Sequence, residues 1–185
     1  LSPIELPTGE GSAEPFLSTS DDMVLLSWLE PEGSGHALRH VRITAAGAGV
    51  AETIVSRDDH FVNWADVPSV IQGPDGRRHA HFLQRGGTGT YDYSVRVTTR
   101  SDAGWSEPIV AHDDHTSTEH GFVTLVTGDD GSLGALWLDG RQYVDGAHGA
   151  ASDEMTLRWR QWSPTGEAGP EALLDARVCD CCQTG

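Results

Sequence analysis

The feature that most constrains the fold is a repeat among the strand-like segments. Three apolar segments recur, LLSWLE at 25–30, HAHFLQ at 79–84 and GALWLD at 134–139, and their aromatic residues are 54 and 55 residues apart. Alternating apolar residues bounded by Asp-Gly and other glycine turns predict antiparallel strands. Four such strands repeating at about 50 residues are typical of the blades of a β-propeller. We therefore expect an all-β propeller of four-stranded antiparallel blades, with a plain meander or a sandwich as the alternative.

The repeat divides the chain into about three blades. We expect an outer strand of a closing blade and an entry loop over 1–14, blades over 15–56, 57–111 and 112–175, and the start of a fourth blade over 176–185. The first of these segments contains SPIEL, which matches the outer-strand pattern SEPIV of the second blade. Since three blades do not close a ring, we expect the remaining blades to come from a longer chain or from a second copy.

Charge restricts the classes of partner. The chain has a net charge of −16, and its twelve basic residues are all arginine. Nucleic acids and anionic membranes need a basic surface, so we expect neither as a partner. No apolar run reaches the ~18 residues of a membrane-spanning helix. The N-terminal segment LSPIELPTGEG lacks the features of a signal peptide, so we expect any targeting segment to have been removed already.

One turn resembles a known motif. In the segment RSDAGWSEP, Ser101, Asp102, Gly104 and Trp105 match a shortened Asp-box hairpin. The chain resembles the sialidase-like (BNR, Asp-box) six-bladed propellers, and the segment CDCCQT is similar to one found in a bacterial branch of them. This resemblance implies an exported protein, periplasmic or secreted, with the Asp box on the face opposite the active site. A plain glycine turn is the alternative interpretation.

The resemblance also implies which residues sialidase activity requires. Sialidases of this family use an arginine triad, an acid/base Asp, and a Tyr nucleophile assisted by Glu. One arginine belongs to a motif near the first inner strand, where this chain reads EPFLST. We therefore expect no true sialidase activity and, if the chain is an enzyme, another activity of the glycoside hydrolase type.

Blade geometry predicts which loops meet at the mouth of the propeller. They are 56–66, 111–120 and 175–182, together with the loops between second and third strands. Candidate catalytic residues there are Glu119, His120, Asp66 and Arg141, and candidate ligand-binding residues are Arg141, Asp139 and Arg85. Carboxylates and imidazole transfer protons, and Arg binds carboxylates through two hydrogen bonds.

Each candidate also has a structural interpretation. Glu119 and His120 form a hydrogen-bonded inner pair in that case, and Arg141 pairs with Asp139. Two loops share the sequence Asp-Asp-His, at 58–60 and 113–115, and these residues are then turn formers.

The three cysteines are Cys179, Cys181 and Cys182. Thiolates this close bind a soft metal such as Cu(I), or Zn with a further ligand, for which His120 is a candidate. A structural disulfide, which an exported protein permits, and redox chemistry are the alternatives.

These observations leave three functions open. The first is an exported propeller that binds or processes a carbohydrate at its mouth. The second is an extracytoplasmic Cu- or Zn-binding protein built on the cysteines, and the third is a structural propeller that binds other proteins.

Overall fold

The chain folds into three antiparallel β-sheets. The computed structural model describes residues 3–20, 23–143 and 154–179, and over these residues it contains strands and turns but no helix. The first sheet has the strands β1 (Ala13–Ser20), β2 (Met23–Glu32), β3 (Gly35–Thr44), β4 (Gly47–Ala48) and β5 (Glu52–Arg57). The second has β6 (Ser69–Gln72), β7 (Arg78–Arg85), β8 (Tyr93–Ser101), β9 (Gly104–Trp105) and β10 (Ile109–Val110). The third has β11 (His120–Thr127), β12 (Leu133–Asp139), β13 (Met155–Trp162) and β14 (Ala172–Val178).

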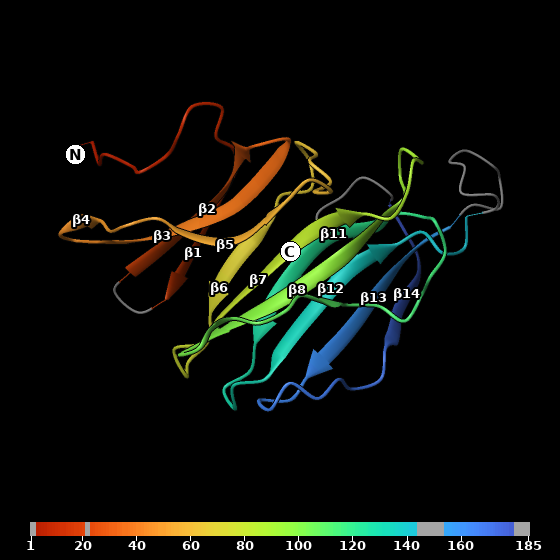
Figure 1. Cartoon of the computed structure of the whole chain (residues 1–185). Helices are drawn as coiled ribbons and strands as arrows, with labels where there is room; N and C mark the ends of the chain where they lie inside the picture. The colour runs from red at the N-terminus through yellow and green to blue at the C-terminus, as the bar shows by residue number, and fades with distance from the viewer. Residues whose placement is uncertain (1–2, 21–22, 144–153, 180–185) are drawn as a thin grey trace.

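Each sheet is a propeller blade. The strands run in chain order from β1 through β2 and β3 to β5, from β6 through β7 and β8 to β10, and from β11 to β14. The short strands β4 and β9 extend the hairpins that follow β3 and β8. Figure 1 shows the three sheets side by side in chain order, from orange through yellow-green to blue. The expected all-β propeller with about three four-stranded blades is therefore confirmed.

Alternation along the strands produces the cores between the blades. In β12, Leu133, Ala135 and Trp137 face the second blade, where they pack in one cluster with Leu83 and Val95. Leu138, on the opposite face of β12, packs in a different cluster. A separate apolar cluster joins the first blade to the second. Because one slip in register would turn every such side chain to the wrong face, this pattern specifies the blade packing.

The ends of the described chain differ from the predicted strands. Residues 3–9, which include most of SPIEL, lie outside any strand. Strand β14 extends to Val178, so residues 175–178 belong to the third blade and not to the expected mouth loop. Within the described residues, no helix has the length and apolarity needed to cross a membrane.

Candidate functional site

Loops from neighbouring blades converge at one end of the second and third blades, which we call the mouth. The loop from β5 to β6 is attached to the end of β7, because the Arg85 N–H donates a 2.8 Å hydrogen bond to the Asp59 carbonyl. The loop from β10 to β11 is attached to the end of β12, because the Gly140 N–H donates a 2.8 Å bond to the Glu119 carbonyl. The structure therefore places two of the three predicted mouth loops at this end, and the bond from the Phe122 N–H to Asp66 connects the first of them to β11.

Asp66 lies at this junction and is only 1% exposed. Its Oδ2 accepts a 2.6 Å hydrogen bond from the Phe122 N–H. The pairing of β11 with β12 is irregular here, between Gly121 and Thr124. Phe122, within this irregularity, has a φ of 51°. A β-bulge of this kind redirects backbone groups away from the ladder. A side chain on Gly121 would place its Cβ 2.1 Å from Oδ2 of Asp66, so glycine is required for the carboxyl to fit.

The protonation of Asp66 follows from this setting. Burial raises the pKa of Asp66 to about 7, and the nearby charge of Glu119 raises it further, while the Phe122 N–H opposes both. An ordinary Asp titrates near pH 4, so this carboxyl still holds its proton in a large fraction of molecules at neutral pH. Such a group suits proton donation.

Glu119 is paired with Tyr93. The Tyr93 hydroxyl donates a 2.5 Å hydrogen bond to Oε1 of Glu119, and the exposed fractions of the two residues are only 1% and 4%. Burial, followed by the charges of Glu119 and Asp66, raises the pKa of Tyr93 far above its ordinary value. Tyr93 also stacks on Phe61, with ring centroids 3.9 Å apart. A tyrosine in this environment is a neutral hydrogen-bond donor and is poorly suited to act as a nucleophile.

His120 lies between the Thr118 carbonyl and the Asp114 carboxylate. Its Nδ1 lies 3.0 Å from the Thr118 carbonyl, and its Nε2 lies 3.0 Å from Oδ2 of Asp114. The ring of His112 stacks on it at 3.9 Å between centroids. Burial, with the proximity of His120, lowers the pKa of His112 to about 3. Since His120 is fully buried and both its nitrogens face protein oxygens, it has no ring nitrogen directed at a ligand or metal.

Arg141 is paired as the structural interpretation predicted. Its Nε and Nη2 both donate 2.7 Å bonds to the buried carboxylate of Asp139. Burial alone would raise the pKa of Asp139, but the bonds from Arg141 and Trp137 and the charge of His120 hold it below the ordinary value. Nη2 of Arg141 also lies 2.8 Å from Glu171. Two of the three candidate ligand-binding residues, Arg141 and Asp139, are thus engaged with other protein groups.

Arg85 remains accessible at the mouth. It is exposed, and its guanidinium lies over the ring of Phe61, 5.0 Å from the ring centroid. This cation–π contact orients the side chain and leaves its N–H groups on the solvent side. Of the ligand-binding candidates, Arg85 alone is not held in an ion pair within the described residues.

The two Asp-Asp-His segments pair mainly with other side chains. Asp59 accepts bonds from Arg57 at 2.6 Å and from Gln84 at 2.7 Å. Asp113 pairs with Arg160, across to the third blade. Asp114 accepts a backbone bond of the kind expected of a turn former, from the Thr116 N–H at 3.1 Å.

The cysteine cluster falls mostly outside the described residues. Cys179 follows β14 and is exposed, whereas Cys181 and Cys182 are not described. Among the described residues, no group of three or more His, Cys, Asp or Glu side chains has an arrangement that would hold a metal ion.

Two aromatic residues at the mouth were not among the predicted site residues. Trp64 is 85% exposed and Tyr91 is 44% exposed. Trp64 lies in a hydrogen-bonded turn, because the Asp66 N–H donates to the Asn63 carbonyl at 3.1 Å and the Ala65 N–H donates to the Asn63 side chain at 3.0 Å. Nothing in the local sequence FVNWADVP distinguishes an exposed Trp64 from a buried one, so its exposure could be read only from the structure.

Comparison with known proteins supports the fold. No known sequence family and no curated protein matches this chain. Its structure resembles a thermostable family-43 glycoside hydrolase, with a TM-score of 0.52 and 13% identity over 94% of this chain and 56% of that one. It also resembles an endo-1,4-β-xylanase from Bacteroides thetaiotaomicron, with a TM-score of 0.54 and 14% identity over 97% of this chain and 64% of that one.

A weaker likeness, with a TM-score of 0.49, is to a family-25 polysaccharide lyase, an ulvan lyase. The chain spans less than two thirds of the length of each of these proteins. At these identities the likeness concerns the fold alone. The chain therefore has the propeller-type fold found in carbohydrate-processing enzymes.

Proposed function

We propose that this chain is a carbohydrate-binding propeller module whose ligand lies at the mouth against Trp64. The observation that carries the proposal is the 85% exposure of this indole on a hydrogen-bonded turn that also leads to Asp66. A flat aromatic face held in water binds the C–H face of a sugar ring while its edge remains solvated. Tyr91 and Arg85 supply further contacts from neighbouring parts of the mouth. The fold shared with glycoside hydrolases supports the same class of ligand.

Quenching of tryptophan fluorescence tests this proposal. The probes are soluble oligosaccharides from xylan, arabinan and cellulose, with acrylamide as the quencher. A bound saccharide should shield Trp64 and lower the quenching constant of the wild type. Trp64→Ala should abolish the shielding, because it removes the indole that the ligand covers. Val50→Ala, at an 88% exposed position between β4 and β5, is the control and should behave as the wild type does. Shielding that survives Trp64→Ala unchanged would refute the proposal.

A second candidate function is glycoside processing, and the buried acid Asp66 favours it. A protonated carboxyl near a second carboxylate is the arrangement used to protonate a leaving oxygen. In this scheme Asp66 donates its proton to the leaving oxygen as the glycosidic C–O bond breaks, and Glu119, oriented by Tyr93, stabilises the positive charge that develops on the sugar. A water molecule then adds to the anomeric carbon and returns a proton to Asp66. Both carboxyls are buried, so the side chains around them must part before a substrate reaches them.

Hydrolysis of the same saccharides, followed as release of reducing ends, tests the second function. Because Asp66 must be protonated to act as an acid, the rate should fall as the pH rises above about 7. Asp66→Asn keeps the shape of the side chain and should abolish the reaction. Asp102→Asn, on an exposed turn at the other end of the strands, should not affect it. A folded Asp66→Asn variant of normal activity would exclude this role.

We also propose a periplasmic or secreted location, because it suits a protein that binds polysaccharides. Further blades from a longer chain or a second copy would complete the ring. Copper or zinc binding by the cysteines gains no support from the described residues.

A further inference from the structure

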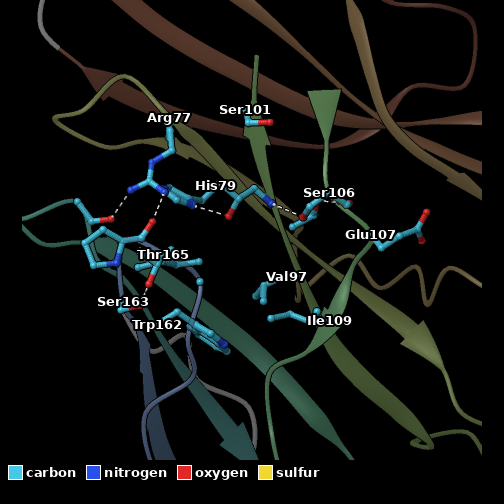
Figure 2. A pocket seen from close by; sticks show the side chains of 16 residues that line it. Arg77, His79, Val97, Ser101, Ser106, Glu107, Ile109, Trp162, Ser163 and Thr165 are labelled. Atoms are coloured by element: carbon cyan, nitrogen blue, oxygen red, sulfur yellow. Dashed lines mark hydrogen bonds between the residues drawn. The ribbon is translucent and has the colours of Figure 1, made fainter. Parts of the chain in front are cut away.

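A hollow lies between the second and third blades, at the end of the strands opposite the mouth. It has a volume of about 330 Å³. Figure 2 shows Arg77, Thr165 and Trp162 on one side of it and Ser106, Glu107 and Ile109 on the other. Sites for small ligands begin at about 300 Å³, so this volume suits one or two rings.

The deep wall of the hollow is apolar. Val97, Leu133 and Trp162 line it and belong to the core between the two blades, while Ile109 lies at the rim and is 46% exposed. An apolar wall of this kind makes contact with the C–H face of a ring.

The guanidinium of Arg77 is already engaged with protein groups. Its Nε donates to Asp75 at 2.5 Å, its Nη1 to the Pro164 carbonyl at 2.6 Å, and its Nη2 to the Gly131 carbonyl at 3.1 Å. These bonds join the second blade to two turns of the third and fix the width of the hollow. They leave no unpaired cation to attract an anionic ligand, and the net charge of −16 disfavours anions further.

Uncharged polar groups surround the apolar wall. Hydroxyl groups of Thr99, Ser106, Ser163 and Thr165 line the hollow. His79 is 2% exposed, and its Nδ1 lies 2.9 Å from the Thr99 hydroxyl, while its Nε2 has no hydrogen-bond partner within the described structure. Burial, together with the charge of Arg77, lowers the pKa of His79 to about 4, so the ring is neutral at pH 7. Because His79 lines the hollow, a hydroxyl group of a bound ligand is a suitable donor to this nitrogen.

From this combination we infer that the hollow binds a neutral saccharide unit, at a site separate from the mouth. The apolar wall takes one face of the ring, and the surrounding hydroxyl groups exchange hydrogen bonds with the sugar hydroxyls. The Glu107 carboxylate accepts hydrogen bonds from the sugar and repels acidic sugars, which the engaged Arg77 does not attract. Such a site would hold a polysaccharide chain on the face away from the mouth. It does not depend on what the mouth binds.

Saturation-transfer NMR tests the inference with defined probes. Xylobiose and methyl β-xylopyranoside are the neutral probes, methyl β-glucuronide is the anionic probe and glucosamine is the cationic probe. We expect millimolar binding of the neutral probes, as is usual for small ligands with few contacts. The glucuronide should bind more weakly than xylobiose.

Two variants close the hollow from opposite sides. Ile109→Trp acts from the second blade and Thr165→Trp, at an exposed turn position, acts from the third; each should weaken xylobiose binding about tenfold or more. Leu173→Trp is the matched control, because Leu173 is 49% exposed on the edge strand β14 and outside the hollow. If Ile109→Trp does not fold, Thr165→Trp decides the question.

The mouth variant separates this inference from the proposed function. Trp64→Ala should leave the binding at the hollow intact, even if it abolishes the binding at the mouth. Three results would overturn the inference: binding that both tryptophan variants leave unchanged, binding that Trp64→Ala abolishes entirely, or no binding of a neutral saccharide by the wild type. Tighter binding of glucosamine than of xylobiose would also overturn it, since the hollow would then be a cation site based on Glu107.

Discussion

Replacing His60 with leucine should make the protein less sensitive to acid. His60 is 5% exposed, it packs edge-on against Phe82 with centroids 5.0 Å apart, and neither ring nitrogen has a hydrogen-bond partner within the described structure. Burial, with a contribution from the charge of His36, lowers the pKa of His60 from 6.5 to about 4, while the charge of Asp59 opposes the shift. The folded protein therefore resists protonation that the unfolded chain accepts.

The size of the effect follows from the two pKa values. Below pH 6.5 the unfolded chain takes up a proton at this histidine and the folded protein does not, so stability falls until the pH reaches the folded pKa of about 4. Between pH 7 and pH 5, the loss from this one group is about 2 kcal/mol. His60→Leu removes the group, so the stability of the variant relative to the wild type should rise by that amount over the same interval.

Urea unfolding followed by circular dichroism at pH 7, 6 and 5 measures this difference. At pH 7 the stability of the leucine variant, relative to the wild type, depends on how well leucine fills the site. The test is how this difference in unfolding free energy changes with pH. Phe61→Leu is the control, because it alters the adjacent buried position without a titrating group, and its effect should be the same at each pH. A His60→Leu difference that stays constant from pH 7 to pH 5 would refute the reasoning.

Two further variants test the packing around the two sites. Gly121→Ala places a Cβ against the Asp66 carboxyl and the Tyr93 ring. It should lower the free energy of unfolding, measured by urea unfolding, by about 1 to 3 kcal/mol. An unchanged urea midpoint would mean that the Asp66 carboxyl lies elsewhere. Arg77→Met removes the hydrogen bonds to two carbonyls of the third blade and should cost about 1 to 2 kcal/mol in the same assay. Arg177→Met, at an exposed position on β14, is its control and should leave the midpoint unchanged.

The candidate site was only partly predictable because its decisive contacts join distant residues. Asp66, Glu119 and Arg85 were expected at the mouth and lie there, since loop positions follow from the order of strands. The role of Arg141 was left open between two interpretations, and its two 2.7 Å bonds to Asp139 favour the internal ion pair. Glu119 and His120 were left open between a site and a structural pair, and in the structure Glu119 accepts a bond from Tyr93 while His120 lies against Asp114.

The sequence by itself determined the blades. Alternating apolar residues and glycine turns act over a few positions, so the strands of LLSWLE, HAHFLQ and GALWLD and their common spacing can be read without a structure. Only the tertiary structure decided the chemistry of the mouth and the presence of the hollow at the opposite end of the strands. Asp66 meets the Phe122 N–H across 56 positions, and the Tyr93 hydroxyl meets Glu119 across 26. Burial of a carboxyl, and therefore its pKa, depends on how neighbouring blades pack together, and no local pattern specifies that packing.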